Sequence, residues 1–345
     1  MKALVLEEYK KLVISDVPEP SIAPSEVLIR VHSCGICGSD VHGYDGSSGR
    51  RIPPVIMGHE ASGVIAKLGV DVKGFAEGER VTFDSMISCG RCRFCRGGTP
   101  NLCDDRMVLG VSCGDYRRNG AFAEYVNVPA HIVFKVPEAL PFNEAAMVEP
   151  VSVAVHAVNL TPVSLGDTAL VVGAGMIGLL TVQALRAAGC GTIIATDLAD
   201  DRLEAAKKMG ADLTLNPKTT NVVEAAKELT NGTGVDIAME AVGAEVTVAT
   251  AIDSVRKGGS ITLIGNITPT IRFGVQSVVT REIAVRGSCA SSNDYPACLD
   301  LMGRGVIRTA DLISATIPLE DGPTMFDRLY SHEPGLTKVI FNPLA

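Results

Sequence analysis

The stretch ALVVGAGMIG, residues 169–178, joins an apolar run to three glycines in the spacing GxGxxG. The apolar run 169–172 predicts a buried strand, and the residues after the third glycine predict a helix. Gly173 permits a tight turn, Gly175 lets the backbone approach a pyrophosphate, and Gly178 allows the helix to pack closely on the strand. Because the N-terminus of a helix favours negative charge, this turn predicts a dinucleotide site.

The residues that follow strengthen this interpretation. A second apolar run, 192–196, is followed directly by Asp197, about twenty residues after the third glycine. An acid at this position hydrogen-bonds the adenosine ribose. A carboxylate at this position repels a 2′-phosphate, which favours NAD over NADP. Arg202 either lies along the adenine or is a solvated helix residue. The alternative is that the glycines only form a tight turn and that Asp197 caps the next helix.

The same alternation of strand and helix extends over residues 151–289. Helical periodicity separates most of the apolar runs, which lie at 169–172, 192–196, 213–215, 236–239, 261–264 and 284–286. Such a series predicts an α/β domain with a doubly wound parallel sheet of the Rossmann type, whose ligands bind at the carboxyl ends of the strands.

Residues 1–150 have a different pattern, with short β-type runs separated by Gly and Pro. These runs are 2–6, 26–32, 63–68, 79–83, 123–128 and 132–136. They predict an antiparallel, barrel-like domain. The alternation of strands and helices stops in the segment 290–345, and its last apolar run, 337–341, predicts a strand that returns to the first domain.

The composition excludes several functions. The chain has 345 residues, 31 Lys and Arg against 39 Asp and Glu, and no Trp, so its net charge of −8 and few aromatic residues disfavour nucleic-acid and membrane partners. Acids at Glu7 and Glu8 interrupt any signal-peptide core, and no uncharged apolar run reaches the roughly 18 residues that span a bilayer. We therefore expect a cytoplasmic protein, whose ten cysteines are thiols or metal ligands.

Four of these cysteines fall into one glycine-rich segment, about 85–110, with the spacing CxxCxxCx7C. They are Cys89, Cys92, Cys95 and Cys103. Four thiolates complete the tetrahedral coordination of Zn²⁺ and leave no open position, which predicts a structural zinc site. An iron–sulfur cluster is the main alternative because it also accepts four thiolates. Zinc is favoured because nothing else in the chain indicates electron transfer.

A second set of ligand-type residues suits a catalytic zinc, which needs three protein ligands and one exchangeable position. Cys37 and His59 supply two ligands. No cysteine lies between Cys113 and Cys190, so the stretch that joins the domains cannot supply a thiolate. That stretch offers Glu149 in an apolar setting, where a carboxylate is costly unless it is paired or bound to metal. We therefore expect Glu149 to be the third ligand.

Two further acids lie close to these residues in the sequence. Glu60 follows His59 directly and either bonds the zinc-bound water, exchanges with it as a ligand, or is a buried acid paired with an arginine. Asp40 could orient His59 through its second ring nitrogen, as metal-bound imidazoles usually require.

Taken together, these segments resemble the zinc-containing medium-chain alcohol dehydrogenases from end to end of the chain. The matching segments are CGICGSDVH (34–42), GHEASGVIAKLG (58–69), GERV (78–81), the four-cysteine motif, GAFAEY (120–125), VEP (148–150) and GAGMIG (173–178). Glutamate as the third ligand of the catalytic zinc resembles the polyol (sorbitol, or L-iditol 2-) dehydrogenase branch.

This resemblance implies a fold, a cofactor and a set of site residues. The first domain would be GroES-like and completed by the C-terminus, and two zinc ions and NAD would be bound. Residues implied to line NAD are Gly173, Gly175, Met176, Ile177, Gly178, Asp197, Arg202, Leu263, Ile264, Gly265, Ser288, Cys289 and Ala290. Related enzymes are dimers or tetramers, and a strand near 284–286 at the sheet edge leads us to expect a homotetramer.

The resemblance also implies a reaction. Hydride would pass from a secondary alcohol of a polyol such as sorbitol, xylitol or L-iditol to NAD, giving the ketose, while zinc lowers the pKa of the alcohol. Ser39 would take the alcohol proton and His42 would pass it to bulk water. The alternative is that Ser39 is a helix or turn cap and His42 a surface residue.

Other functions remain open from the sequence. An L-threonine 3-dehydrogenase or a phosphorylated-polyol dehydrogenase of the galactitol-1-phosphate type would use the same architecture, and Arg117 and Arg118 either bind a substrate phosphate or pair with surface acids. A zinc- and NAD-binding protein without catalysis is a third alternative, which the intact set of ligand residues disfavours.

Overall fold

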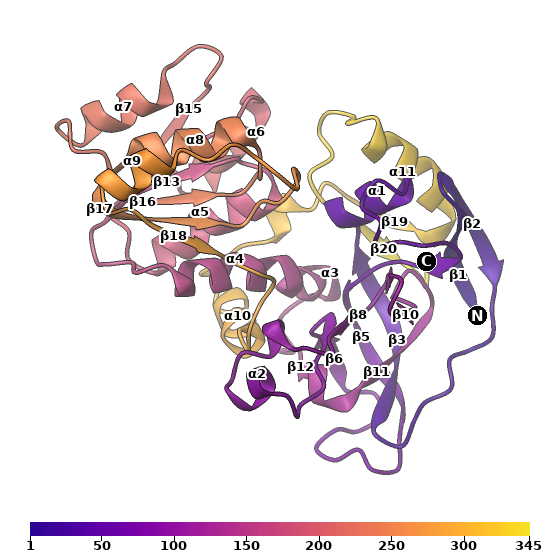
Figure 1. Cartoon of the computed structure of the whole chain (residues 1–345). Helices are drawn as coiled ribbons and strands as arrows, with labels where there is room; N and C mark the ends of the chain where they lie inside the picture. Colours follow the sequence, from indigo (N-terminus) through magenta and orange to yellow (C-terminus); the bar gives the residue numbers. More distant parts are fainter. The chain divides into compact units, whose positions relative to one another are not determined.

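The chain divides into two units in the computed structural model, which describes residues 1–345 (Figure 1). Unit 1 comprises Met1–Glu149, Tyr295–Gly303 and Thr309–Ala345, and unit 2 comprises Pro150–Asp294 and Arg304–Arg308. None of the helices combines the length and the apolar character that a membrane-spanning helix needs.

The sequence predicts that the chain leaves the second domain at residue 290, whereas residues 290–294 stay with unit 2. The reason is the buried carboxylate of Asp294, which lies 3.0 Å from Nδ1 of His156 and accepts a hydrogen bond of 3.0 Å from Asn159. Both partners belong to helix α4 (Val148–Leu160).

Unit 2 contains a six-stranded parallel sheet of order β15-β14-β13-β16-β17-β18, which confirms the predicted Rossmann-type fold. Each predicted apolar run forms a strand: β13 (Thr168–Val172), β14 (Thr192–Thr196), β15 (Leu213–Leu215), β16 (Val235–Glu240), β17 (Val255–Leu263) and β18 (Ala284–Gly287). The helices between them are α5 (Met176–Ala187), α6 (Asp200–Lys208), α7 (Val222–Leu229), α8 (Glu245–Ser254) and α9 (Val275–Thr280).

The register of this sheet aligns the ends of its central strands. Val172 pairs with Thr196 on one side and with Glu240 on the other, and Glu240 pairs with Leu263. The carboxyl ends of β13, β14, β16 and β17 therefore meet at one edge, where ligands of such sheets bind. A core of side chains such as Leu170, Ile194 and Ile261, which are fully buried, fixes this register.

Unit 1 is built around a seven-stranded sheet with the path β12-β6-β5-β3-β20-β19, in which β11 also pairs with β3. Its strands are β3 (Glu26–Gly35), β5 (Glu60–Leu68), β6 (Arg80–Phe83), β11 (Tyr125–Pro129), β12 (Val133–Lys135), β19 (Ala315–Pro318) and β20 (Val339–Asn342). A three-stranded sheet contains β1 (Lys2–Glu8), β2 (Lys11–Asp16) and β4 (Val55–Ile56), and two short pairs join β7 (Met86–Ile87) to β8 (Met107–Val108) and β9 (Val111–Ser112) to β10 (Arg117–Arg118).

The helices of unit 1 are short. They are α1 (Gly38–Tyr44), α2 (Arg93–Arg96), α3 (Phe142–Ala146), α10 (Tyr295–Gly303) and α11 (Gly322–Tyr330). The C-terminal strand β20 enters the sheet beside β3, where Ile340 pairs with Gly35 and Phe341 with Cys34. This pairing brings the residue before β20, Lys338, next to the segment that leads into α1.

Candidate active site and metal centres

The four cysteines of the CxxCxxCx7C motif form one cluster in unit 1, with all four Sγ atoms within 4.8 Å of one another. Backbone N–H groups face three of the sulfurs, since Cys89 N lies 3.3 Å from Cys103 Sγ, Cys92 N 3.4 Å from Cys89 Sγ, and Cys95 N 3.5 Å from Cys92 Sγ. Such donors favour thiolates. The donor set and its spacing fit a closed tetrahedral cation site.

The acidity of these thiols follows from their surroundings. Backbone N–H groups of Cys95 and Asp104 lower the pKa of Cys92 to about 6, whereas burial raises the pKa of Cys103 to about 12. A buried thiol that must lose its proton is stabilised by a bound cation, so metal binding at this cluster releases protons.

The second cluster consists of Cys37, His59 and Glu60, whose ligand atoms also lie within 4.8 Å of one another. Cys37 is the N-cap of α1 and takes part in a capping box, in which its backbone N–H donates to Asp40 at 3.2 Å. His59 and Glu60 stand at the start of β5 and are 6% and 1% exposed. The end of one loop and the start of one strand thus supply the ligand atoms.

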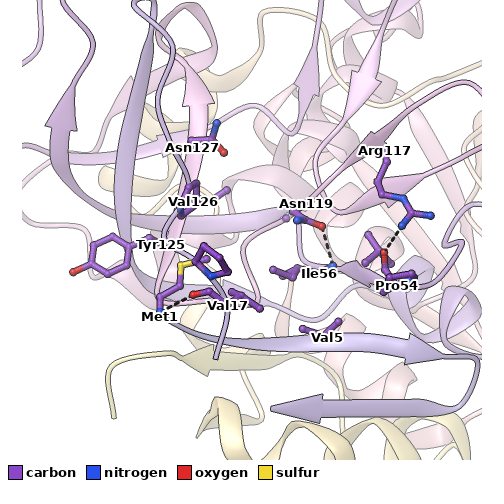
Figure 2. Close-up of a pocket in the computed structure, with 14 residues that line it drawn as sticks. Met1, Val5, Val17, Pro54, Ile56, Arg117, Asn119, Tyr125, Val126 and Asn127 are labelled. Atoms are coloured by element: carbon purple, nitrogen blue, oxygen red, sulfur yellow. Dashed lines mark hydrogen bonds between the residues drawn. The ribbon is translucent and has the colours of Figure 1, made fainter. Parts of the chain in front are cut away.

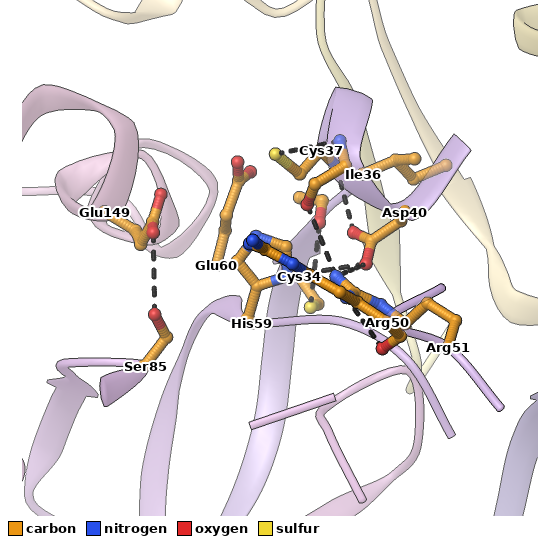
Figure 3. A network of polar contacts seen from close by, with 12 residues as sticks. Cys34, Ile36, Cys37, Asp40, Arg50, Arg51, His59, Glu60, Ser85 and Glu149 are labelled. Carbon is orange, nitrogen blue, oxygen red and sulfur yellow. Dashed lines mark hydrogen bonds and ion pairs between the residues drawn. The ribbon is translucent and has the colours of Figure 1, made fainter. Parts of the chain in front are cut away.

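Asp40 lies beside the imidazole of His59, as predicted from the sequence. Its Oδ1 atom is 3.4 Å from Nδ1 of His59, and the carboxylate is fully buried. Burial raises the pKa of Asp40, but the charges of His59 and Arg51 outweigh it and hold that pKa well below its usual range. With Nδ1 turned toward an anion, Nε2 is the nitrogen available to a cation (Figure 3).

Glu60 pairs with a buried cation, which is a lysine and not the arginine that the sequence alternative named. Nζ of Lys338 lies 2.8 and 3.0 Å from the two carboxylate oxygens and 3.0 Å from the carbonyl oxygen of Ile36. Burial lowers the pKa of Lys338, but the charge of Glu60 outweighs it and raises that pKa above its ordinary value. The cation that pairs with the Glu60 carboxylate is therefore supplied by the residue that precedes strand β20.

Glu149 is the second residue of α4 and does not belong to the 4.8 Å cluster. Figure 3 shows its side chain beside that of Glu60, with the Ser85 hydroxyl donating to it at 3.5 Å. Burial raises the pKa of Glu149 to about 7. A carboxylate that is destabilised in this way suits a cation as partner, and its role as third ligand stays a prediction.

This pKa gives the first testable prediction, which concerns protein freed of metal by a chelator. Glu149→Gln is expected to be more stable than the wild type by about 1–3 kcal/mol at pH 8, and equally stable below pH 4.5. The folded pKa lies above the ordinary value of 4.5, so the unfavourable charge develops as the pH rises through the window from 4.5 to about 7. Urea unfolding at several pH values measures the difference.

The matched control is Glu138→Gln, since that glutamate is exposed. It should follow the wild type at every pH. A Glu149→Gln advantage that did not change between pH 4.5 and 8 would show that burial of the charge is not its cause.

The two predicted relay residues, Ser39 and His42, lie three residues apart on α1 and are both exposed. This spacing places their side chains on one face of the helix. The hydroxyl of Ser39 accepts a hydrogen bond of 3.3 Å from Arg51, a residue for which the sequence analysis found no role. Their action as a relay remains a prediction.

In unit 2 the glycine turn has the geometry that the motif predicts. Gly173 follows β13 with a φ of 96°, and Gly175 is the N-cap of α5, whose first residues are Met176 and Ile177. A Cβ at Gly178 would lie 1.8 Å from the Gly173 carbonyl oxygen, while nothing lies within 4 Å of one at Gly175. The helix is therefore packed on the strand and the space above Gly175 is open to a ligand.

Asp197 follows β14 and binds the glycine turn directly. Its carboxylate accepts hydrogen bonds from the N–H groups of Ala174 at 2.9 Å and Ala199 at 3.0 Å. Nη1 of Arg202 lies 3.7 Å away, and the Arg202 side chain is mostly exposed. The alternative role of Asp197 as a side-chain cap of helix α6 is wrong, because the N-cap is Ala199 and no side chain caps that helix.

The remaining predicted cofactor residues lie at the carboxyl ends of β17 and β18. The N–H groups of Ile264 and Gly265 both donate to the Glu240 carbonyl, and Ser288 N–H donates to the Leu263 carbonyl at 2.9 Å. Cys289 is exposed and Ala290 has a φ of 52°. These residues share the edge of the sheet with the glycine turn.

Unit 1 also contains a pocket of about 410 Å³, which residues outside these clusters line (Figure 2). Its walls include Val5, Ile56 and Tyr125, together with Arg117, which donates to the Pro54 carbonyl. None of the predicted metal ligands lines it. Arg118 pairs with Glu26 at 2.9 Å, so it pairs with an acid, as one of its two sequence interpretations states.

Comparison with known proteins identifies the family. The family "Alcohol dehydrogenase GroES-like domain" matches residues 23–138, and the family "Zinc-binding dehydrogenase" matches residues 177–304. Sorbitol dehydrogenase of Bacillus subtilis (strain 168) is 37% identical over 347 aligned residues, which cover 99% of this chain and 97% of that protein. The chain belongs to the zinc-containing medium-chain alcohol dehydrogenases, in their polyol dehydrogenase branch.

Solved structures agree with this assignment of the dehydrogenase. A putative zinc-binding dehydrogenase from Sinorhizobium meliloti 1021, solved bound to NADP, has a TM-score of 0.91 and 33% identity over 99% of both chains. Galactitol-1-phosphate dehydrogenase from Escherichia coli has a TM-score of 0.92 and 26% identity over 99% of this chain and 100% of that chain. The predicted fold class is therefore confirmed.

Two buried cations of the site, Arg51 and Lys338, were missed by the sequence analysis. Lys338 carried a signal, because it is the one charged residue in the otherwise uncharged run 337–341. A lone charge in an apolar strand needs a buried partner. Arg51 follows another arginine in a polar loop and carried no comparable signal.

Proposed function

We propose that this dehydrogenase oxidises a secondary hydroxyl of a polyol to a ketone, with NAD as hydride acceptor. The observation that carries the proposal is the cluster of Cys37, His59 and Glu60 within 4.8 Å, with Asp40 held against the imidazole. Cys37, His59 and Glu149 would hold the catalytic zinc, and the four-cysteine cluster would hold a structural zinc. When bound, the catalytic zinc acts as a Lewis acid on the alcohol oxygen, and NAD accepts the hydride.

The residues of the chain then supply proton transfer and binding. Ser39 accepts the alcohol proton, and His42, exposed three residues further along α1, passes it to solvent. Glu60, paired with Lys338, places a carboxylate in addition to that of Glu149 next to Cys37 and His59. The glycine turn and the N-terminus of α5 bind the pyrophosphate, and residues 263–265 and 288–290 line the cofactor.

The substrate screen separates this proposal from its alternatives. Zinc-loaded protein is incubated with sorbitol, xylitol, L-iditol, galactitol, their phosphates and L-threonine, and NADH formation is followed by absorbance. Activity on unphosphorylated polyols supports the proposal, whereas activity on L-threonine alone or on phosphorylated polyols alone would replace it. The pairing of Arg118 with Glu26 favours an unphosphorylated substrate.

The choice of cofactor gives a second testable prediction. Asp197→Ala is expected to lower the ratio of kcat/KM with NAD to that with NADP by at least about tenfold, because a like charge next to a 2′-phosphate costs several kcal/mol. Arg202, 3.7 Å from Asp197, would then be free to approach the phosphate. Asp201→Asn, at an exposed acid of α6, is the control and should leave the ratio unchanged.

Unchanged cofactor preference in Asp197→Ala would contradict the ribose assignment. Asp197 also binds the N–H of Ala174, so the thermal midpoint of both variants is recorded to separate loosening of the turn from loss of charge repulsion.

We also propose that the enzyme is a cytoplasmic homotetramer. Strand β18 is the edge of the unit 2 sheet and pairs only with β17, so its other side is available to a second copy. Light scattering of the purified protein tests this, with a mass of four chains of 36.1 kDa expected. A monomer at all concentrations would contradict it.

A further inference from the structure

Arg51 is a buried cation in unit 1 that none of the roles above requires. It is 3% exposed and lies in the loop between α1 and β4. Backbone hydrogen bonds fix this loop on both sides of the arginine, since Ser112 N–H donates to the Arg50 carbonyl at 3.2 Å and Ile52 N–H donates to the Ser112 carbonyl at 3.2 Å. The arginine therefore enters the protein from an anchored backbone.

Helix α1 leaves room for this side chain at Gly43. A Cβ at that position would lie 2.1 Å from Cγ of Arg51, far inside van der Waals contact. Glycine costs roughly 0.5–1 kcal/mol in a helix relative to alanine. Helix α1, which carries Ser39 and His42, thus has a glycine, a weak helix former, at the position that packs against the Arg51 side chain.

The guanidinium of Arg51 contacts both Asp40 and Ser39, and Figure 3 shows it beside Asp40. Its Nη2 atom lies 3.0 Å from Oδ1 of Asp40 and 3.3 Å from Oγ of Ser39, and Nη1 donates to the Arg50 carbonyl at 3.3 Å. The same Oδ1 atom is 3.4 Å from Nδ1 of His59. One nitrogen therefore contacts both the acid that orients His59 and the hydroxyl proposed to accept the proton.

The contact with Ser39 has a direction, because a guanidinium only donates. The hydroxyl oxygen of serine has two acceptor lone pairs and one donor hydrogen. Arg51 occupies one lone pair, which leaves the other for the alcohol proton and the O–H for an outward donor bond. The hydroxyl is thereby oriented for transfer from the substrate side toward solvent.

The contact with Asp40 acts on the metal ligands. The Asp40 carboxylate faces His59 through Oδ1 and accepts the N–H of Cys37 through Oδ2 at 3.2 Å. A carboxylate that is free to rotate would lose one of these contacts, whereas a rigid planar donor on Oδ1 fixes its orientation. Arg51 thus holds, through one acid, two of the three residues proposed to bind the catalytic zinc, Cys37 and His59.

We propose that Arg51 is a positioning residue of the active site, which fixes Asp40 against the zinc ligand His59 and orients the hydroxyl of Ser39 for proton transfer. The part that concerns Ser39 rests on the proposed function, whereas the part that concerns His59 rests only on zinc binding. Two separate readouts therefore test it.

The first readout is zinc affinity, measured by competition with a chromophoric chelator, with the zinc of the four-cysteine cluster as internal reference. Arg51→Met is expected to bind the catalytic zinc about 10–100-fold more weakly, which is typical for loss of an outer-shell partner. Arg51→Lys keeps the charge and should recover part of this affinity. Arg50→Met, at the neighbouring exposed arginine, is the control and should match the wild type.

Gly43→Ala provides a variant that keeps Arg51 and favours the helix. The new methyl group must displace the Arg51 side chain, so zinc affinity should fall although helix propensity rises. The thermal midpoints of Gly43→Ala and Arg51→Met are recorded as well, and a loss of zinc affinity at an unchanged midpoint assigns the effect to displacement of the guanidinium.

The second readout is catalysis at saturating zinc. Arg51→Lys is expected to lower kcat about tenfold without changing the KM for NAD. An ammonium lacks the second nitrogen, Nη1, whose bond to the Arg50 carbonyl fixes the plane that holds Nη2 between Asp40 and Ser39. Zinc affinity of Arg51→Met within twofold of the control would overturn the role toward His59, and unchanged kcat in Arg51→Lys would overturn the role toward Ser39. If the wild type oxidises none of the polyols, the proposed function and the role toward Ser39 both fail, and the zinc measurement still decides the role toward His59.

Discussion

A His59→Ala protein is expected to retain one zinc ion per chain instead of two and to lose about a thousandfold in kcat/KM with its polyol substrate. His59, the proposed ligand, is 6% exposed, and its Nδ1 atom lies 3.4 Å from the Asp40 carboxylate. Lewis-acid activation by a bound metal contributes several kcal/mol to catalysis, and about 4 kcal/mol corresponds to a factor of a thousand. Metal analysis and steady-state kinetics on the same sample give both numbers.

Two variants serve as controls for this experiment. His131→Ala changes an exposed histidine and should keep both zinc ions and full activity. Cys103→Ser should lose the other zinc ion and lower the thermal midpoint, because the four-cysteine cluster is then incomplete. If His59→Ala kept two zinc ions or more than a tenth of the activity, the assignment of the catalytic ligand would be wrong.

Lys338→Met is expected to destabilise metal-free protein by about 3–5 kcal/mol. The substitution removes the cation from Glu60, which is 1% exposed and has both carboxylate oxygens within 3.0 Å of Nζ. Removing one partner of a buried pair leaves an uncompensated charge, which costs more than the pair itself contributes. Chemical unfolding in the presence of a chelator measures the loss, since a bound metal would offset the charge of Glu60.

The double variant Lys338→Met/Glu60→Gln separates this charge effect from lost packing. Without either charge the protein should regain most of the stability that each single variant loses, so the two effects are strongly non-additive. Lys67→Met, at an exposed lysine that pairs with Glu19, should change the stability little. Additive losses in the double variant would show that Glu60 and Lys338 stabilise the fold independently.

Much of the fold was predictable because its signals are local. The GxGxxG turn and the six apolar runs of unit 2 lie in continuous segments, and each run forms a strand. The strands β2 and β19 and helix α11 were missed. β2 (Lys11–Asp16) contains only three consecutive apolar residues, Leu12–Ile14, between polar and charged ones, and it pairs with β1.

In the candidate site, the ligand-type residues and the acid Asp40 beside His59 were predictable from the sequence, whereas the buried cations were not. Cys37 and His59 carry the chemistry of metal ligands in their residue type, and so do the four clustered cysteines. The cations that balance the buried acids do not, because Lys338 is 278 positions from Glu60 in the sequence and reaches it only through the pairing of β20 with β3. Any of the 31 Lys and Arg residues could have filled that role.

The proposed reaction is tested by following the hydride itself. Zinc-loaded protein is incubated with NAD and a polyol that carries deuterium on its secondary carbinol carbon, and the reduced cofactor is analysed by mass spectrometry. We predict one deuterium in each NADH. No NADH should form after zinc is removed, and its formation should recover when zinc is returned. Unlabelled NADH, or no NADH from any polyol by protein that binds both zinc and NAD, would contradict the proposal that this dehydrogenase oxidises polyols at Cys37 and His59.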